Sequence, residues 1–178
     1  MKKLIILVFT VLLSAFSFAQ GLDFGVKVGA NFSNFSDASN VSNKTGFLGG
    51  IFAAVKFNDK LAIQPELLYS QQGAEFDVGK IDLNYVNVPV IIKYYLFQGF
   101  NLQAGPQFGF VVDDNVSKVF NNVAEAESFD LTGVVGVGYD LALGLRLDGR
   151  FNFGLSNTFS QGKGKNSVFS LALGYSFL

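Results

Sequence analysis

The sequence predicts an all-β protein, an eight-stranded antiparallel up-and-down β-barrel that spans a membrane, and three observations carry this prediction. The chain of 178 residues holds 21 Phe, 20 Gly and only 3 Pro, which suits long strands better than a helical bundle, because Gly costs about 1 kcal/mol in a helix interior. Apolar and polar residues alternate with a period of two along eight segments, as in strands with two different faces. Short and long connectors between these segments alternate strictly.

The first 19 residues are predicted to be a cleavable signal peptide that lies outside the barrel. Two lysines precede an apolar run, Leu4 to Leu13, and a small-x-small cleavage site ends at Ala19. A membrane anchor is the alternative, but the apolar run is short for a membrane span, and charged residues follow soon after it. The expected domains are therefore a signal peptide, 1–19, and an outer-membrane barrel domain, 20–178.

The eight expected strands follow one another along the rest of the chain. They cover residues 22–33, 45–57, 61–73, 82–97, 100–113, 127–140, 143–156 and 167–178. Three connectors are tight, at 58–60, 98–99 and 141–142. Four are longer and polar, at 34–44, 74–81, 114–126 and 157–166. An even-stranded meander gives this alternation when one rim faces a confined side and the other faces outward. The N-terminus and the C-terminus of the barrel domain are therefore both expected at the rim that carries the short turns.

Each expected strand has one bulky apolar face and one small or polar face. In the seventh strand the apolar face is Leu145, Leu147, Phe151 and Phe153, and the other face carries Arg146, Asp148 and Arg150. The interior of an eight-stranded barrel is only just wide enough for side chains to fill it. Several dozen large apolar side chains would not fit there, whereas Gly, Ser, Asn and a few long charged groups would. The apolar face should therefore point outward, into hydrocarbon.

The same parity predicts a network of charged residues inside the lumen. Its members are Lys27, Lys56, Glu66, Lys93, Asp130, Asp140, Arg146, Asp148 and Arg150. Buried charges are tolerated only when they are paired and hydrogen-bonded, so the network is expected to fill the barrel as a structural plug. An ion-selective pore lining is the alternative interpretation.

The partners of the two arginines of the seventh strand can be predicted from the same pattern. Arg146 and Arg150 are expected to pair with Asp148, and with Asp130 or Asp140 of the flanking sixth strand or the more distant Glu66.

Three tyrosines lie on the outward parity a few residues from a short turn or from the chain end. They are Tyr94, Tyr139 and Tyr175. Amphipathic rings favour the membrane interface, so these residues are predicted to form an aromatic girdle at the periplasmic rim.

The composition argues against an enzyme and against several kinds of partner. The absence of His and Cys removes the usual general base of hydrolytic triads and all thiol chemistry. Asp113-Asp114-Asn115 supplies three oxygens without the rest of a calcium-loop motif, so neither a metal nor a cofactor is predicted. Without the two signal-peptide lysines, 11 basic residues remain against 14 acidic ones, and an exported chain of that sign is not expected to bind nucleic acid.

Five segments, which follow one another in order, resemble the PorT-like outer-membrane β-barrel proteins of Bacteroidetes, and the resemblance extends over essentially the whole chain after residue 20. They read "FGVKVGANFS", "LAIQPELLYSQQGAEF", "LNYVNVPVIIKYYL", "NLQAGPQFGF" and "FSLALGYSF". The resemblance implies an eight-stranded barrel, often labelled porin-like, with no cofactor. One departure is that the chain ends in Phe177-Leu178, whereas such barrels usually end on an aromatic residue.

These patterns predict a non-enzymatic outer-membrane barrel with a structural or interaction role, as a small subunit of an envelope or secretion assembly. A narrow passive porin-like channel is the alternative, and a membrane-embedded enzyme comes third. The expected partners are outer-membrane lipid, lipopolysaccharide and other envelope proteins. Lys118, Lys163 and Lys165 of the longer connectors could meet lipopolysaccharide phosphates.

Overall fold

The computed structural model describes residues 21–36, 41–76, 79–114, 129–155 and 165–177. The predicted signal peptide, Lys118 and Lys163 lie outside the described residues. Lys165 is described as part of a strand, but its side chain is not described. The eight strands are β1 (Gly21–Ser36), β2 (Val41–Asn58), β3 (Leu61–Phe76), β4 (Gly79–Phe97), β5 (Phe100–Asp114), β6 (Phe129–Asp140), β7 (Leu145–Gly154) and β8 (Lys165–Ser176).

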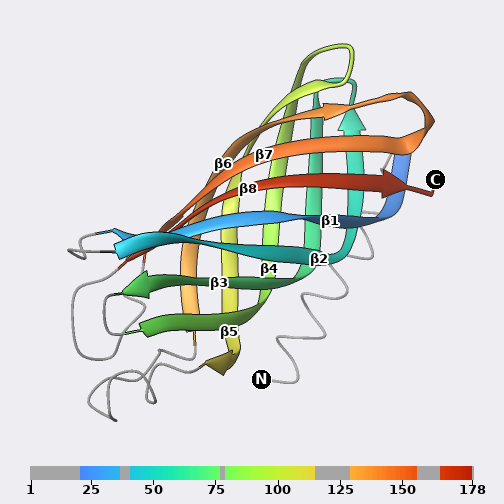
Figure 1. The fold of residues 1–178 in the computed structure, drawn as a ribbon. Coiled ribbons are helices and arrows are strands. Elements are labelled where there is room, and N and C mark those ends of the chain that lie inside the picture. The colour runs from blue at the N-terminus through green and yellow to red at the C-terminus, as the bar shows by residue number, and fades with distance from the viewer. Residues whose placement is uncertain (1–20, 37–40, 77–78, 115–128, 156–164, 178) are drawn as a thin grey trace, which may run out of the picture.

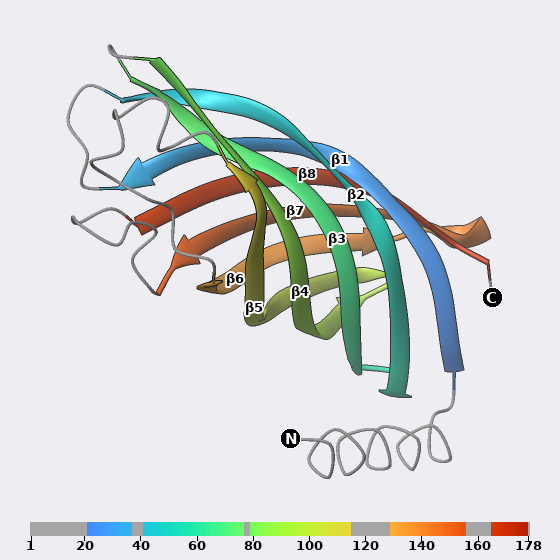
Figure 2. The ribbon, with the colours of Figure 1, turned by 90° about the horizontal axis from the view of Figure 1, so that it is seen from below.

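The strands form one closed antiparallel barrel in chain order, and this confirms the predicted fold class (Figure 1). Each strand pairs with its sequence neighbour, and β1 pairs with β8 from Gly25↔Ser176 to Ser36↔Lys165. Figure 2 shows the first and last strands side by side along this seam. Closure leaves neither edge of the sheet unpaired, which is what a sheet in hydrocarbon requires.

Three tight connections lie at the rim where β1 begins and β8 ends. They are the β2–β3 turn at Asn58–Lys60, the β4–β5 turn at Gln98–Gly99, and the 3₁₀ turn η1 (Ala142–Gly144) between β6 and β7. This end of the barrel is called the short-turn rim below. The C-terminal end of β8 lies beside the β6–β7 connection (Figure 1).

Glycine is required where these connections pass through the left-handed region. Gly99 has a φ of 85°, and a Cβ on it would lie 2.1 Å from the carbonyl oxygen of Asp140. Gly144 has a φ of 82°. The prediction placed the last tight turn at 141–142 and started the next strand at 143. In the structure Leu143 also has a positive φ, of 65°, so the chain cannot resume strand geometry before Leu145.

In β1 to β5 and β8, the strands extend further from the short-turn rim than the sequence predicted, whereas β7 ends at Gly154, short of the predicted residue 156. Residues 34–36 pair with β8, and β2 and β3 remain paired as far as Val41↔Phe76. The prediction stopped the strands where polar residues begin, but ladder hydrogen bonds use backbone groups and continue under polar side chains.

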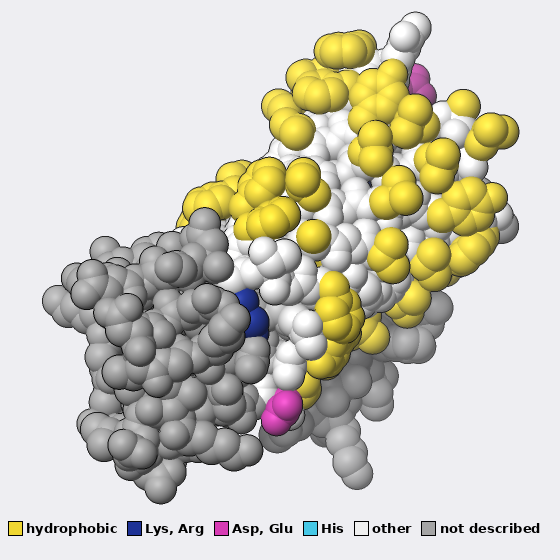
Figure 3. Space-filling model, viewed as in Figure 1, with side chains coloured by type: hydrophobic (Ala, Val, Ile, Leu, Met, Phe, Trp, Pro, Cys, Tyr) yellow, Lys and Arg dark blue, Asp and Glu magenta, His cyan; other side chains and the backbone are white. Residues whose placement is uncertain are grey.

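Side chains divide between the two faces as the alternation predicts. On β7, Leu147 and Phe151 are 49% and 45% exposed, whereas Arg146 and Asp148 are each 4% exposed. Figure 3 shows apolar side chains spread over the outside of the barrel, with few charged groups among them. In the part of the chain that is described, no helix is both long and apolar enough to cross a membrane.

Candidate functional site: a charged lumen

The centre of the lumen is built around Glu66, which β3 points inward. Arg150 of β7 donates to both carboxylate oxygens of Glu66, at 2.9 and 2.7 Å. Lys27 of β1 donates to Glu66 Oε1 at 2.8 Å, and Gln64 donates to the same oxygen. Glu66 is 4% exposed. A bidentate arginine and a second cation therefore offset the cost of burying this carboxylate.

Asp148 of β7 is the second buried acid of this centre. Its Oδ2 lies 2.6 Å from Lys27 Nζ and 3.5 Å from Arg150 Nη2. Its Oδ1 accepts a 2.6 Å hydrogen bond from Gln103, whose own Oε1 accepts from Arg150 Nε at 2.7 Å. Gln103 thus bridges an acid and a base of the network. Two cations and two acids close one interlocked cluster.

A second cluster lies nearer the short-turn rim, around Arg146. Its guanidinium donates to Asp23 through Nη2 and to Gln64 Oε1 through Nη1 at 3.0 Å. Asp140 Oδ2 lies 3.7 Å from the same Nη1. The guanidinium carbon also lies 4.8 Å from the centre of the Phe52 ring, where a cation–π contact adds to the ion pairs.

Asp140 joins this cluster to the wall formed by β4. Lys93 donates to Asp140 Oδ1 at 2.9 Å, and the hydroxyl of Tyr95 donates to Oδ2 at 2.6 Å. Lys93 is fully buried. The last residue of β6 therefore contacts two side chains of β4 and Arg146 of β7 at once. The two clusters together are called the charged layer below.

Farther from the short-turn rim the lumen is filled by neutral polar groups, called the amide layer. Its buried members are Asn31, Ser70, Asn87, Gln107, Thr132, Asn152 and Ser170. Asn31 donates to Ser70 at 2.8 Å, and Gln107 donates to Thr132 at 3.1 Å. The cavity left between the two layers is about 20 Å³, room for about one water, and Asn152, whose Oδ1 has no partner among the described residues, lines it.

The structure brings together seven of the nine residues predicted for the lumen network. They are Lys27, Glu66, Lys93, Asp140, Arg146, Asp148 and Arg150. Lys56 points into the rim end of the lumen without joining an ion pair within 4 Å among the described residues. Asp130 is 3% exposed and lies at the other end of β6 from Asp140.

The three tyrosines predicted as a girdle all point outward near the short-turn rim. Tyr94, Tyr139 and Tyr175 are 44%, 37% and 46% exposed. Tyr139 precedes the last residue of β6, and Tyr175 pairs with Leu145, the first residue of β7.

Sequence reasoning missed three polar residues on which the network depends. Asp23 shares the inward parity of Lys27, so extending the alternation by two pairs of residues would have identified it. Gln64 and Gln103 stand on inward positions too, but a neutral amide carries no signal that marks it as a bridge between charges. Nothing in the sequence ranks them above other inward glutamines.

The acids of the charged layer are all paired with cations. Each of its acids has a cation within 4 Å, so none is held as an unpaired acid or base. The described residues hold no group of three or more acidic, His or Cys side chains that could bind a metal ion. Close packing leaves little room for more atoms. A Cβ added to Gly138 would lie 2.2 Å from Gln103 Nε2 and 2.8 Å from Asp148 Oδ1.

A closed sheet that turns its apolar face outward and its charges inward defines a membrane-spanning β-barrel. The chain belongs to the family described as the outer membrane protein beta-barrel domain, whose model matches residues 18–160. This membership places the protein in the bacterial outer membrane.

Solved structures share this fold at low sequence identity. Ail, the attachment invasion locus protein of Yersinia pestis, crystallised with the heparin analogue sucrose octasulfate, is 17% identical, with 89% of this chain and 100% of that chain covered and a TM-score of 0.55. Neisserial surface protein A is 14% identical over the same shares, with a TM-score of 0.57. No curated protein matches the sequence.

Proposed function

We propose that this protein is a non-enzymatic outer-membrane barrel with a structural or interaction role, as a small subunit of an envelope or secretion assembly. The observation that carries the proposal is the charged layer, which crosses the lumen from β1 to β3 and β7 through direct contacts of 2.6–2.9 Å. A lumen closed by interlocked ion pairs supplies rigidity rather than a path for solutes.

Further features support this role and indicate the family, the orientation and the partners of the barrel. The segments that resemble PorT-like proteins suggest a member of that group, and residues 1–19 would be its export signal. The tyrosine girdle would fix the height of the short-turn rim at the periplasmic interface. The complex of Ail with a heparin analogue is a precedent for ligand binding on this fold. On that basis we assign lipopolysaccharide phosphates and envelope proteins as partners of the outer connectors.

A pull-down in mild detergent tests the interaction role. Tagged full-length protein should recover a defined set of envelope proteins at fixed stoichiometry. A matched barrel with its outer connectors replaced by short glycine–serine loops should lose them. Recovery of the same proteins by both versions would contradict the assignment to the connectors, and a barrel that purifies alone would contradict the subunit role.

A narrow passive channel is the second candidate, because a cavity of about 780 Å³ enters the lumen from the short-turn rim. Planar-bilayer recording separates the two. The plug predicts no steady conductance from the wild type, and ion-conducting steps from a Glu66→Ala, Arg150→Ala double variant that removes both long side chains from the centre. Reproducible ion-selective steps from the wild type would favour the channel.

A further inference from the structure

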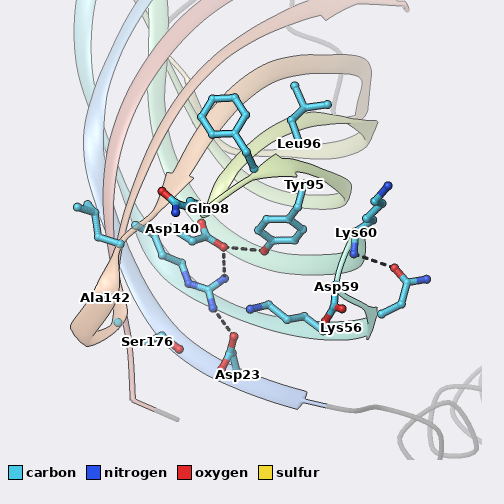
Figure 4. Close-up of a pocket in the computed structure, with 16 residues that line it drawn as sticks. Asp23, Lys56, Asp59, Lys60, Tyr95, Leu96, Gln98, Asp140, Ala142 and Ser176 are labelled. Carbon is cyan, nitrogen blue, oxygen red and sulfur yellow. Dashed lines mark hydrogen bonds and ion pairs between the residues drawn. The ribbon is translucent and has the colours of Figure 1, made fainter.

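The cavity at the short-turn rim differs from the rest of the lumen because it is large. Its volume is about 780 Å³, against about 20 Å³ between the two layers. Small-molecule sites fall in the range of roughly 300–1,000 Å³. The turns at Asn58–Lys60 and Gln98–Gly99 and the 3₁₀ turn form its outer edge (Figure 4). Arg146 also lines it.

The charges of the cavity and of the charged layer beneath it do not balance. Six cations (Lys27, Lys56, Lys60, Lys93, Arg146 and Arg150) stand against five acids (Asp23, Asp59, Glu66, Asp140 and Asp148). Four of these cations have a carboxylate within 4 Å. Among the described residues, Lys60 in the exposed turn and Lys56 have none. Lys56 points into the cavity. Its ammonium group lies 5.4 Å from the centre of the Tyr95 ring, at the cavity wall.

Figure 4 shows the Lys56 side chain extended into the cavity on the side of Tyr95. Lys60, two residues beyond the end of the same strand, lines the cavity from an exposed turn. The hydroxyl of Tyr95 and the Nη atoms of Arg146 already serve Asp140, Asp23 and Gln64. Lys56 is therefore the inward-pointing lysine of this cavity whose ammonium group still has donors to offer.

We propose that the rim cavity binds a small organic monocarboxylate, with Lys56 as the anion-binding residue. One negative charge would balance the surplus of one cation. A dianion such as phosphate would fit less well, because Asp23, Asp59 and Asp140 also line the cavity and would repel the second charge. The volume exceeds what a single simple ion fills, which points to a ligand with an organic body.

Titration of the full-length barrel in zwitterionic detergent with benzoate tests the site, with two-dimensional NMR as the readout. Benzoate should shift the signals of Lys56, Tyr95 and Gly144 saturably, whereas the neutral isostere benzamide and inorganic phosphate should shift them at least tenfold more weakly. The variant K56M keeps the length and apolar stem of the side chain but loses the charge, and should weaken benzoate binding at least tenfold. The matched control K163M, in the connector predicted at 157–166, removes a lysine that is not among the cavity's lining residues and should bind as the wild type does.

Three outcomes would overturn the proposal. They are equal binding of benzoate and benzamide, unchanged binding by K56M, and shifts confined to the outward face, which would indicate partition into the detergent. Because K56M touches none of the ion pairs of the charged layer, its unfolding midpoint should match that of the wild type. A loss of binding then reports on the site and not on the fold. The bilayer and pull-down experiments do not depend on Lys56, so the proposed function stands or fails separately.

Discussion

The charged layer and the amide layer fill neighbouring sections of the same lumen by different means. In the charged layer the central acids pair with more than one cation, as Glu66 does with Lys27 and Arg150. In the amide layer the contacts are neutral, although a group can have several partners, as Ser70 has in Asn31 and Gln72. Removal of one buried charge leaves its partner short of a counter-charge, whereas loss of a neutral hydrogen bond costs about 1 kcal/mol. The comparison teaches that the charge of the partners, more than the number of contacts, decides where the barrel is fragile.

The largest effect is expected from Glu66→Gln, which keeps the shape of the side chain. It removes the charge from both short carboxylate contacts of Arg150, whose remaining acid, Asp148, lies 3.5 Å away, and it takes one of two acids from Lys27. The free energy of unfolding should therefore fall by about 3–5 kcal/mol. Urea titration of the barrel in lipid, followed by the gel shift between folded and unfolded forms, measures the change. The double variant Glu66→Gln, Arg150→Met should recover part of the loss, because the under-compensated cation is gone. A double variant less stable than the single one would contradict the pairing.

A smaller loss is expected from Asp148→Ala, of about 3 kcal/mol, because Lys27 and Arg150 keep Glu66 as a partner. Lys60→Ala in the exposed turn is the matched control and should change the free energy of unfolding by less than about 0.5 kcal/mol. If Asp148→Ala is as stable as the wild type, water in the lumen screens its charges. That result would favour the pore lining over the structural plug.

Asp23→Asn tests the outer boundary of the charged layer. Its side chain is 20% exposed and Arg146 keeps Gln64 and Asp140 nearby, so the expected loss is about 1–2 kcal/mol. Because the Asp23–Arg146 pair lies nearest to solvent, raising the salt from 0.1 to 1 M should reduce the difference in free energy of unfolding between Asp23→Asn and the wild type. The same salt change should leave the effect of Glu66→Gln in place. Equal salt sensitivity at both sites would remove the distinction between rim and centre.

The smallest effect is expected in the amide layer, from Gln107→Leu. It removes a neutral hydrogen bond to Thr132 and replaces an amide by an apolar group of similar size, so the loss should be about 1 kcal/mol. The same urea titration measures it. A loss as large as that of Asp148→Ala would contradict the distinction between charged and neutral partners.

Most of the fold was predictable because a strand of period two records its two faces directly in the sequence. The parity of β7 placed Arg146, Asp148 and Arg150 on one face, and all three are buried in the structure. The expected pairing of Arg150 with Glu66 appears in the structure, as does the contact between Arg146 and Asp140.

What parity could not predict is which side chains meet across the barrel. The chief partner of Asp148 is Lys27 of β1, which the sequence prediction did not pair with it. Parity defines a face, but contact across the lumen depends on the height at which each strand presents its residues, and that depends on tilt and stagger. The backbone of η1 could not be predicted either. Leu143 has a positive φ, but leucine is not one of the residues that mark such a turn in a sequence.

The seam between β1 and β8 constrains how the protein reaches its membrane. Its two strands lie at opposite ends of the chain, so the contact with the greatest separation in sequence is also the one that completes the cylinder. Until those strands meet, β1 and β8 each present a row of bare amide and carbonyl groups, and each such group left in hydrocarbon costs several kcal/mol. A half-inserted open sheet is therefore forbidden by solvation alone. The nascent barrel must either zip shut as it enters the lipid or borrow another protein's strand to cover its edges until its own last strand arrives.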